Sequence, residues 1–228
     1  MKLKLWLACC LLSFSLSAQV PADANAIIKA VNAKYMKAKD YRADAVIDTR
    51  ISFLKILPQK AKVLFKQPDK FRIKATGIAI LPKQQFDNLF VLLKDESSYE
   101  AFVSGSEVIN GISTVLVNVI PKKDTGDLVF AKIWVDAKAS LILRSQLTTR
   151  SNGTVLIDYT YGAFEAYALP DKIMFTVEVK KFKIPKAVSA DINSTASKVP
   201  AGKEPKTGKI IISLKNYVLN KGIADTEF

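Results

Sequence analysis

Two Asn-Gly pairs, at residues 110–111 and 152–153, each interrupt a run rich in β-branched and aromatic residues. A two-residue hairpin turn needs positive φ at both central residues, and Asn followed by Gly adopts that conformation with little strain. The pairs predict two hairpins, with strands at residues 99–109 and 112–120 and at residues 141–150 and 154–161. A further apolar run at residues 129–135 lies between the hairpins, so the sequence predicts an antiparallel meander.

The expected strand at residues 129–135 is apolar on both faces. Ile133 and its alternate neighbours would share one face, while Phe130 and Trp134 flank Lys132 on the other. A strand of this kind must be covered on both sides. The face that carries Trp134 could be concave or convex, and Lys132 favours the convex alternative.

The first eighteen residues predict a cleaved signal peptide and export to the periplasm. Lys2 and Lys4 precede an apolar run at residues 5–14, and small residues follow at the expected cleavage site. The run is shorter than the roughly 20 residues that cross a membrane. We therefore expect residues 1–18 to be removed and residues 19–228 to form a single, monomeric domain.

The residue inventory argues against catalysis. The chain has no histidine, and its two cysteines, Cys9 and Cys10, lie in the expected signal peptide. The commonest general base, the thiol nucleophile and the usual zinc ligands are therefore missing from the mature chain. Asp44 and Asp48 share a strand face, but arginines flank them, which favours a solvated ladder of charges. We predict no enzymatic activity, no catalytic residue, no metal site and no cofactor.

The chain is strongly basic. It has 34 Lys and Arg against 21 Asp and Glu, a net charge of +13, and loss of Lys2 and Lys4 with the signal peptide lowers this charge to +11. Such an excess suits an anionic membrane surface or an acidic partner. Because the lysines are spread over many strands of an exported chain, we expect no nucleic-acid partner.

Two segments have the period of an amphipathic helix. Residues 22–37 carry an apolar stripe, with Asp23 as the N-cap. In residues 82–95, apolar side chains recur at positions i, i+3, i+4 and i+7, and Pro82 suits the first turn. This second helix is either a core helix that plugs one end of a barrel or a movable lid over an apolar cavity.

The remaining alternating segments bring the expected total to about ten strands. They lie at residues 41–53, 61–66, 71–76, 172–180 and 209–215. Residues 181–206, rich in Lys, Ala, Ser and Pro, are expected to form a long loop. Because a large antiparallel sheet curls, we predict a mainly β (α+β) fold, with one curved antiparallel sheet and both helices on its concave face.

The order of these elements resembles the bacterial periplasmic carriers of outer-membrane lipoproteins, the LolA-like family, which includes outer-membrane lipoprotein-sorting proteins. Residues 66–72 are similar to the family's Lys-Arg-Pro-x-x-Phe turn, and the helix at residues 86–93 takes the place of its apolar lid. Residues 119–122 and 133–136 resemble two of its strand ends, L-x-P-K and L-x-V-D. Residues 105–111 also resemble the N-terminal domain of the periplasmic stress regulator RseB.

The resemblance implies an unclosed β-barrel whose concave apolar face, lidded by helices, shelters acyl chains of lipids or lipoproteins. The alternative is an envelope sensor or scaffold of the RseB type, which binds another envelope protein. We expect the inward strand faces and the lid stripe to offer more apolar surface than two helices can fill, and so to leave a ligand cavity. The residues expected to line the cavity and the lid are Ile47, Ile51, Val63, Phe65, Phe71, Ile73, Phe86, Leu89, Phe90, Leu93 and Ile133.

Overall fold

The computed structural model describes residues 23–51, 56–77, 85–123, 126–151, 153–178 and 207–228. Its strands are β1 (Asp40–Arg50), β2 (Gln59–Lys66), β3 (Lys70–Ala75), β4 (Tyr99–Ile109), β5 (Ile112–Pro121), β6 (Leu128–Asp136), β7 (Leu141–Thr149), β8 (Gly153–Tyr161), β9 (Pro170–Glu178) and β10 (Thr207–Leu219). Its helices are α1 (Ala24–Tyr35), α2 (Gln85–Lys94) and the 3-10 helices η1 (Glu96–Ser98), η2 (Glu165–Tyr167) and η3 (Asp225–Glu227). The predicted signal peptide, Pro82 and the expected loop at 181–206 lie outside the described residues.

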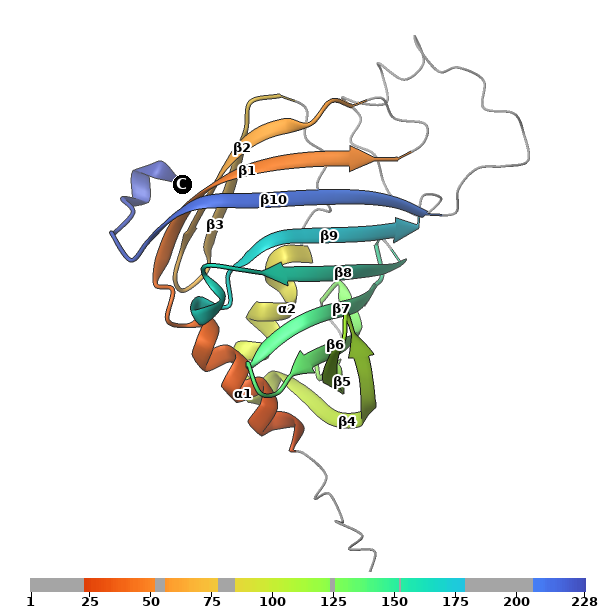
Figure 1. Ribbon diagram of the computed structural model, residues 1–228. Coiled ribbons are helices and arrows are strands. Elements are labelled where there is room, and N and C mark those ends of the chain that lie inside the picture. The colour runs from red at the N-terminus through yellow and green to blue at the C-terminus, as the bar shows by residue number, and fades with distance from the viewer. Residues whose placement is uncertain (1–22, 52–55, 78–84, 124–125, 152, 179–206) are drawn as a thin grey trace, which may run out of the picture.

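The strands form one curved sheet in the order β3-β2-β1-β10-β9-β8-β7-β6-β5-β4 (Figure 1). Every neighbouring pair in this order is antiparallel. β3 and β4 form the two edges and do not pair with each other, so the barrel is not closed. The predicted fold class, a mainly β antiparallel sheet that forms an unclosed barrel, is confirmed.

The two edge strands are consecutive strands of the chain, and α2 comes between them. The chain must therefore return from one edge of the sheet to the other. It does so on the concave side, where α1 and α2 both pack against the inward faces of the strands (Figure 1). The predicted location of the two helices is confirmed.

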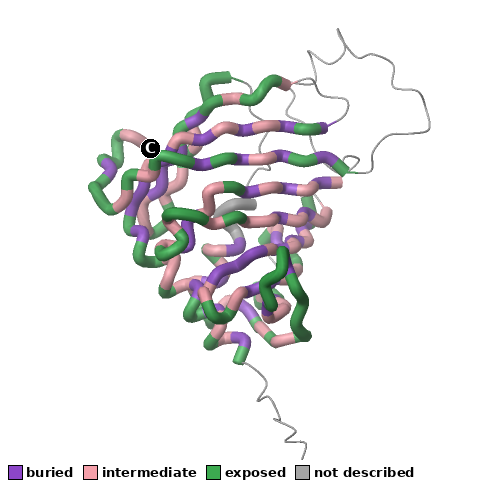
Figure 2. The backbone as a smooth tube through the Cα atoms, viewed as in Figure 1, coloured by how far each residue is buried: buried purple, intermediate pink, exposed green. Residues whose placement is uncertain are grey.

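Side chains alternate between the two faces of the sheet, as the sequence pattern predicts. On the concave side, Ala43 of β1 lies opposite Val63 of β2, and Ile47 lies opposite Ile212 of β10, which in turn lies opposite Ile173 of β9. All five are buried, with at most 7% of the side chain exposed. Figure 2 shows the resulting alternation of buried and less buried positions along the strands.

The first Asn-Gly hairpin forms at the predicted place. Asn110 and Gly111 have φ values of 50° and 82°, and they join β4 to β5. The second hairpin also joins the predicted strands, but its turn differs from the predicted two-residue turn. Gly153, with φ 70°, is the first residue of β8 and pairs with Thr149 of β7, so residues 150–152 separate the paired ends, and Asn152 lies outside the described residues. Asparagine and glycine are the residues that adopt positive φ with least strain.

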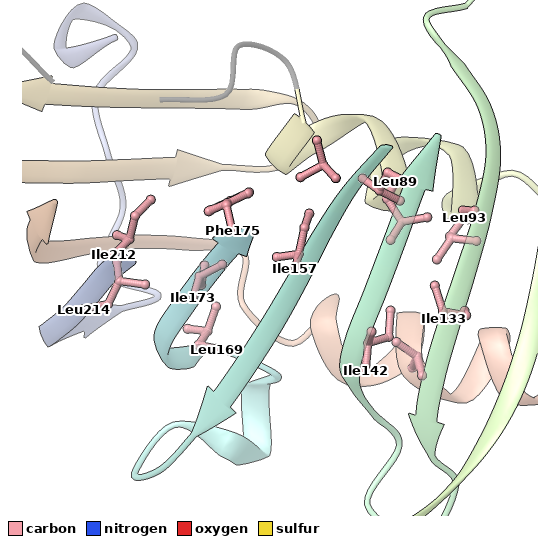
Figure 3. Close-up of a cluster of buried hydrophobic side chains, with 14 of the residues drawn as sticks. Leu89, Leu93, Ile133, Ile142, Ile157, Leu169, Ile173, Phe175, Ile212 and Leu214 are labelled. Carbon is pink, nitrogen blue, oxygen red and sulfur yellow. The ribbon is translucent and has the colours of Figure 1, made fainter. Parts of the chain in front are cut away.

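The hydrophobic core lies between the concave face and the helices. Ile28 and Val31 of α1 are 0% and 1% exposed, and Leu89 and Leu93 of α2 are each 1% exposed. Figure 3 shows the two leucines among inward side chains of the central strands. Asp23 caps α1 as predicted. The helices therefore cover the concave face with the stripes that the sequence indicates.

Trp134 lies on the convex side of the sheet. Its neighbour Ile133 points into the main core, so Trp134 points the other way, and its Nε1 donates a hydrogen bond to Glu107 Oε2 at 2.7 Å. The indole belongs to a second, smaller cluster with Ile109, Leu141, Leu143 and Ala168. Of the two alternatives left open by the sequence, the convex one, which Lys132 favoured, is confirmed.

A substitution at Gly208 tests the packing of β10 against Ile51, the residue that follows β1. A Cβ atom at Gly208 would lie 2.7 Å from Cγ1 of the buried Ile51, which is too close for carbon atoms. We expect Gly208→Ala to lower the free energy of unfolding by about 1–3 kcal/mol. Gly126→Ala is the matched control, because a Cβ there meets no atom within 4 Å. Urea unfolding of both variants checks this, and equal stabilities would contradict it.

Candidate functional site

The predicted site residues lie on the concave face, but most of them are packed against protein. Those exposed by at most 3% are Ile47, Ile51, Val63, Phe65, Leu89, Leu93 and Ile133. Phe71, Ile73 and Phe90 are half-buried. Phe86 belongs to α2, but its side chain lies outside the described residues.

Leu89 and Leu93 of α2 pack on the concave face among inward side chains of the central strands. The larger ligand cavity expected from the sequence stays a prediction. Beside α2 lies a small cavity of about 60 Å³. A water molecule needs at least about 10–15 Å³ of such space, so the cavity holds a few waters or the end of an alkyl chain.

Aromatic rings form most of the cavity wall. The lining residues are Tyr35, Tyr41, Phe71, Phe90, Tyr159, Tyr161, Ala168, Leu169, Pro170 and Ile173. Phe90 of α2 stacks on Tyr35 of α1, with ring centroids 4.7 Å apart. The centroid of the Tyr35 ring also lies 5.7 Å from that of Phe65 on β2. The lid helix therefore supplies part of the wall, and a movement of α2 would open the cavity.

Two of the tyrosines that line the cavity, Tyr159 and Tyr161, have hydroxyl groups that contact polar partners within the protein. Tyr161 donates to the carbonyl of Ile142 at 2.8 Å, and the hydroxyl of Tyr159 lies 3.2 Å from Ser145 Oγ. Because their polar ends have protein partners, these tyrosines offer a ligand their rings. Burial raises the pKa of Tyr159 to about 12, despite the opposing hydrogen bond with Ser145.

These tyrosines are not among the site residues predicted from the sequence. Tyr35 and Tyr41 were recognisable, since they stand on the apolar stripe of a helix and on the inward face of a strand. Tyr159 follows the inward alternation of β8 through its pairing with Ile173. Its position in a cavity wall depends on how the sheet curls, for which the sequence has no local signal.

Three side chains fix the end of the lid helix. The amide Nδ2 of Asn32 on α1 donates to the carbonyl of Leu93, Lys94 Nζ donates to the carbonyl of Pro68, and Ser98 Oγ donates to the carbonyl of Leu92. These carbonyls belong to the last turn of α2 or to the turn between β2 and β3. The position of α2 thus depends on polar contacts at one end as well as on buried leucines, and whether the helix is a fixed core helix or a movable lid stays a prediction.

The side chain of Gln67 is hydrogen-bonded to the residues that follow α1, and not to α2. Its Nε2 donates to the carbonyls of Met36 at 3.0 Å and Ala38 at 2.9 Å. The adjacent Pro68 accepts from Lys94 of α2. The turn between β2 and β3 is therefore the place where both helices are attached to the sheet.

The two aspartates that share the outer face of β1 are paired with basic side chains. Asp44 and Asp48 form ion pairs with Lys62 at 3.1 Å and Arg50 at 2.8 Å, which confirms the ladder of charges. Within the described ranges, no group of three or more His, Cys, Asp or Glu is arranged to hold a metal ion. No helix among the same residues is long and apolar enough to cross a membrane.

No protein-family model matches the chain, and no curated protein matches it. Among solved structures, it is similar to a DUF1329 family protein from Desulfovibrio piger, at 12% identity with a TM-score of 0.57, covering 90% of this chain and 96% of that one. It is also similar to a LolA superfamily protein from Nitrosomonas europaea, at 10% identity with a TM-score of 0.58, covering 92% and 98%. A putative outer membrane lipoprotein-sorting protein domain from Vibrio parahaemolyticus matches at 9% identity with a TM-score of 0.55, covering 90% and 95%. At these identities the likeness shows the fold alone.

Asn32 allows a test of the lid attachment. Asn32→Ala removes the donor to the Leu93 carbonyl, and loss of such a buried partner costs about 1–3 kcal/mol. We expect local opening of α2 to become roughly tenfold easier, since 1.4 kcal/mol is a factor of ten. Hydrogen exchange should then be faster in α2 and unchanged in β8 and β9. The exposed Lys29→Ala on α1 is the control, and unaltered exchange in α2 of Asn32→Ala would contradict the attachment.

Because the hydroxyl of Tyr159 is buried, we predict that the free energy of unfolding falls at alkaline pH. Its pKa rises from about 10 in the unfolded chain to about 12 in the native protein. Its contribution to stability is therefore full below pH 10 and is lost as the pH rises toward 12. Between pH 9 and 11, the unfolding free energy of the wild type should fall by about 1 kcal/mol more than that of Tyr159→Phe. Parallel pH profiles of the two proteins would contradict the buried state of this hydroxyl.

Proposed function

Because the chain has a LolA-like fold whose concave face is covered by an amphipathic helix, we propose that it is a periplasmic binding or carrier protein for acyl chains of lipids or lipoproteins. The observation that supports this proposal most is the packing of Leu89 and Leu93 of α2 on the concave face. These side chains occupy the place that an acyl chain would take. The role is binding and transfer, and no enzymatic step is part of the proposal.

The energy of opening is compatible with exchange of the lid for a ligand. Exposing Leu89 and Leu93 costs about 1.5–3 kcal/mol each. A buried acyl chain gains about 0.8 kcal/mol per CH₂, so roughly four to eight methylene groups offset the exposure of both leucines. Chains longer than this favour the open state, whereas short-chain amphiphiles leave the lid closed.

The aromatic cavity beside Phe90 is the proposed entry point. Phe90 is half-buried, in contrast to the fully packed Leu89 next to it. The end of an acyl chain fits the small cavity and contacts Tyr35, whose ring stacks on Phe90. Separation of these two rings then starts the displacement of α2.

A pair of neighbouring substitutions tests the role of the lid. We expect Phe90→Glu to weaken the binding of a long-chain fluorescent fatty acid about tenfold or more, because a carboxylate is costly to bury in an apolar site. Val91→Glu introduces the same charge at a residue that is 51% exposed, and its affinity should equal that of the wild type. Circular dichroism shows whether both variants are folded. Equal affinities of the two variants for the fatty acid would show that α2 is not part of the binding site.

A scaffold that binds another envelope protein is the rival function, and the small volume of the aromatic cavity, about 60 Å³, favours it. Lipid extraction and mass spectrometry of the protein, purified from the periplasm without detergent, separate the two. Carriage predicts co-purified lipid or lipopeptide in the wild type and its loss in Phe90→Glu. Protein free of lipid, and unable to bind added triacylated lipopeptide, would support the scaffold.

A further inference from the structure

The edge strand β3 has one open side. It pairs with β2 and with no other described strand. Thr76 N donates to the carbonyl of Lys60 at 3.0 Å, which makes these residues a hydrogen-bonded pair at the end of the ladder. Hydrogen-bonded and non-hydrogen-bonded pairs alternate along an antiparallel ladder, so the backbone groups of Ile73 and Ala75 point away from β2. They are placed to pair with a further strand.

The side chains at this edge differ on the two faces of the sheet. Arg72 and Lys74 point outward and are exposed. On the concave face Ile73 is half-buried and Ala75 is exposed, although Val63, opposite Ile73 on β2, is only 3% exposed. The open position next to β3 is therefore basic on its outer side and apolar on its inner side.

A groove on the outer face continues this basic character across the neighbouring strands. It has a volume of about 560 Å³ and includes the edge residues Lys74, Ala75 and Thr76. The other lining residues are Asp44, Ala45, Val46, Lys60, Ala61, Lys62, Lys215 and Asn216. The four lysines of the groove face a single carboxylate, and Asp44 already accepts from Lys62 at 3.1 Å and Asn216 at 2.8 Å. The groove thus has excess positive charge.

The chain itself shows which chemistry this face accepts. Asp225 of η3 forms ion pairs with Lys66 at 2.7 Å and Lys70 at 2.8 Å, next to the start of β3. Lys74 Nζ donates to the backbone carbonyl of Glu227. An acidic turn of this protein therefore already covers part of the basic face, and the exposed outer edge with Arg72 and Lys74 is complementary to more acidic chain.

We propose that β3 binds an extended acidic segment of a partner protein, which adds to the sheet as an outer strand. Acidic residues of that segment lie opposite Arg72 and Lys74, and apolar residues alternate with them beside Ile73 and Ala75. The alternation follows from the basic outer side and the apolar inner side of the edge. A second copy of this chain is a poor occupant, because pairing β3 with itself sets cations against cations. The site does not depend on acyl-chain binding.

The test uses the mature protein and a fluorescein-labelled, end-capped peptide in which Glu and Val alternate. Fluorescence anisotropy should show saturable binding of the Glu-Val peptide to the wild type and at least tenfold weaker binding to Arg72→Glu/Lys74→Glu. A peptide in which Lys and Val alternate should show no saturable binding to the wild type. Lys172→Glu/Lys209→Glu is the control, because it makes the same charge change at exposed positions of β9 and β10. An equal loss in the control would reduce the effect to net charge and overturn the proposal.

Ala75→Pro tests the backbone pairing separately. Proline is tolerated on an edge strand where its nitrogen faces away from the sheet, but it cannot donate to an added strand. We expect it to weaken peptide binding at least tenfold without unfolding the protein, as judged by circular dichroism. Unchanged peptide binding in this folded variant would overturn the proposal. Two other results would also overturn the proposal, if the wild type does not bind the peptide. One is binding of the wild type to phosphatidylglycerol vesicles that is lost in Arg72→Glu/Lys74→Glu, and the other is self-association in sedimentation that is lost in the same variant.

Discussion

The inward face of an open sheet is apolar over all its strands, and something must cover it. In this protein the cover is the packing of Leu89 and Leu93 on the concave face, each with 1% of its side chain exposed. The connection between the two edge strands passes over that face, so α2 is covalently placed where cover is needed. Removal of α2 without a substitute would expose the core of the sheet to water, which the hydrophobic effect opposes.

This dependence links stability to binding. The contacts that close the site are a few apolar side chains of α2, the stack of Phe90 on Tyr35, and the polar attachments at Asn32 and Lys94. The rest of the sheet is held by strand pairing on both sides of β1, interrupted on the β10 side by one bulge. Under the proposed function, α2 is therefore the part of the fold that an acyl chain would replace, and the strand pairing of the sheet would remain intact.

Much of this was predictable from local pattern. The turn at Asn110 and Gly111, the inward alternation of β1 and the stripe of α2 all follow from residue type and period. The alternation failed at the end of β10, which was expected to end at residue 215 but continues to Leu219. The cause is a bulge at Asn216, with φ 55°, where the pairing with β1 shifts by one residue. Closure of the cavity, the tyrosine wall and the open edge of β3 arise from contacts between distant segments, which no local pattern records.

Spin-label distances test the replacement of the lid by a ligand most directly. In a protein produced from Gln19 onward, which contains no native cysteine, labels at Val91→Cys on α2 and Lys172→Cys on the outer face of β9 occupy exposed positions. Without ligand, electron paramagnetic resonance should give one narrow distance distribution, because α2 is packed on the sheet. At saturation with a triacylated lipopeptide, the distribution should move to longer distances and broaden. A distribution that stays narrow and unshifted when binding is complete would contradict displacement of α2 by an acyl chain.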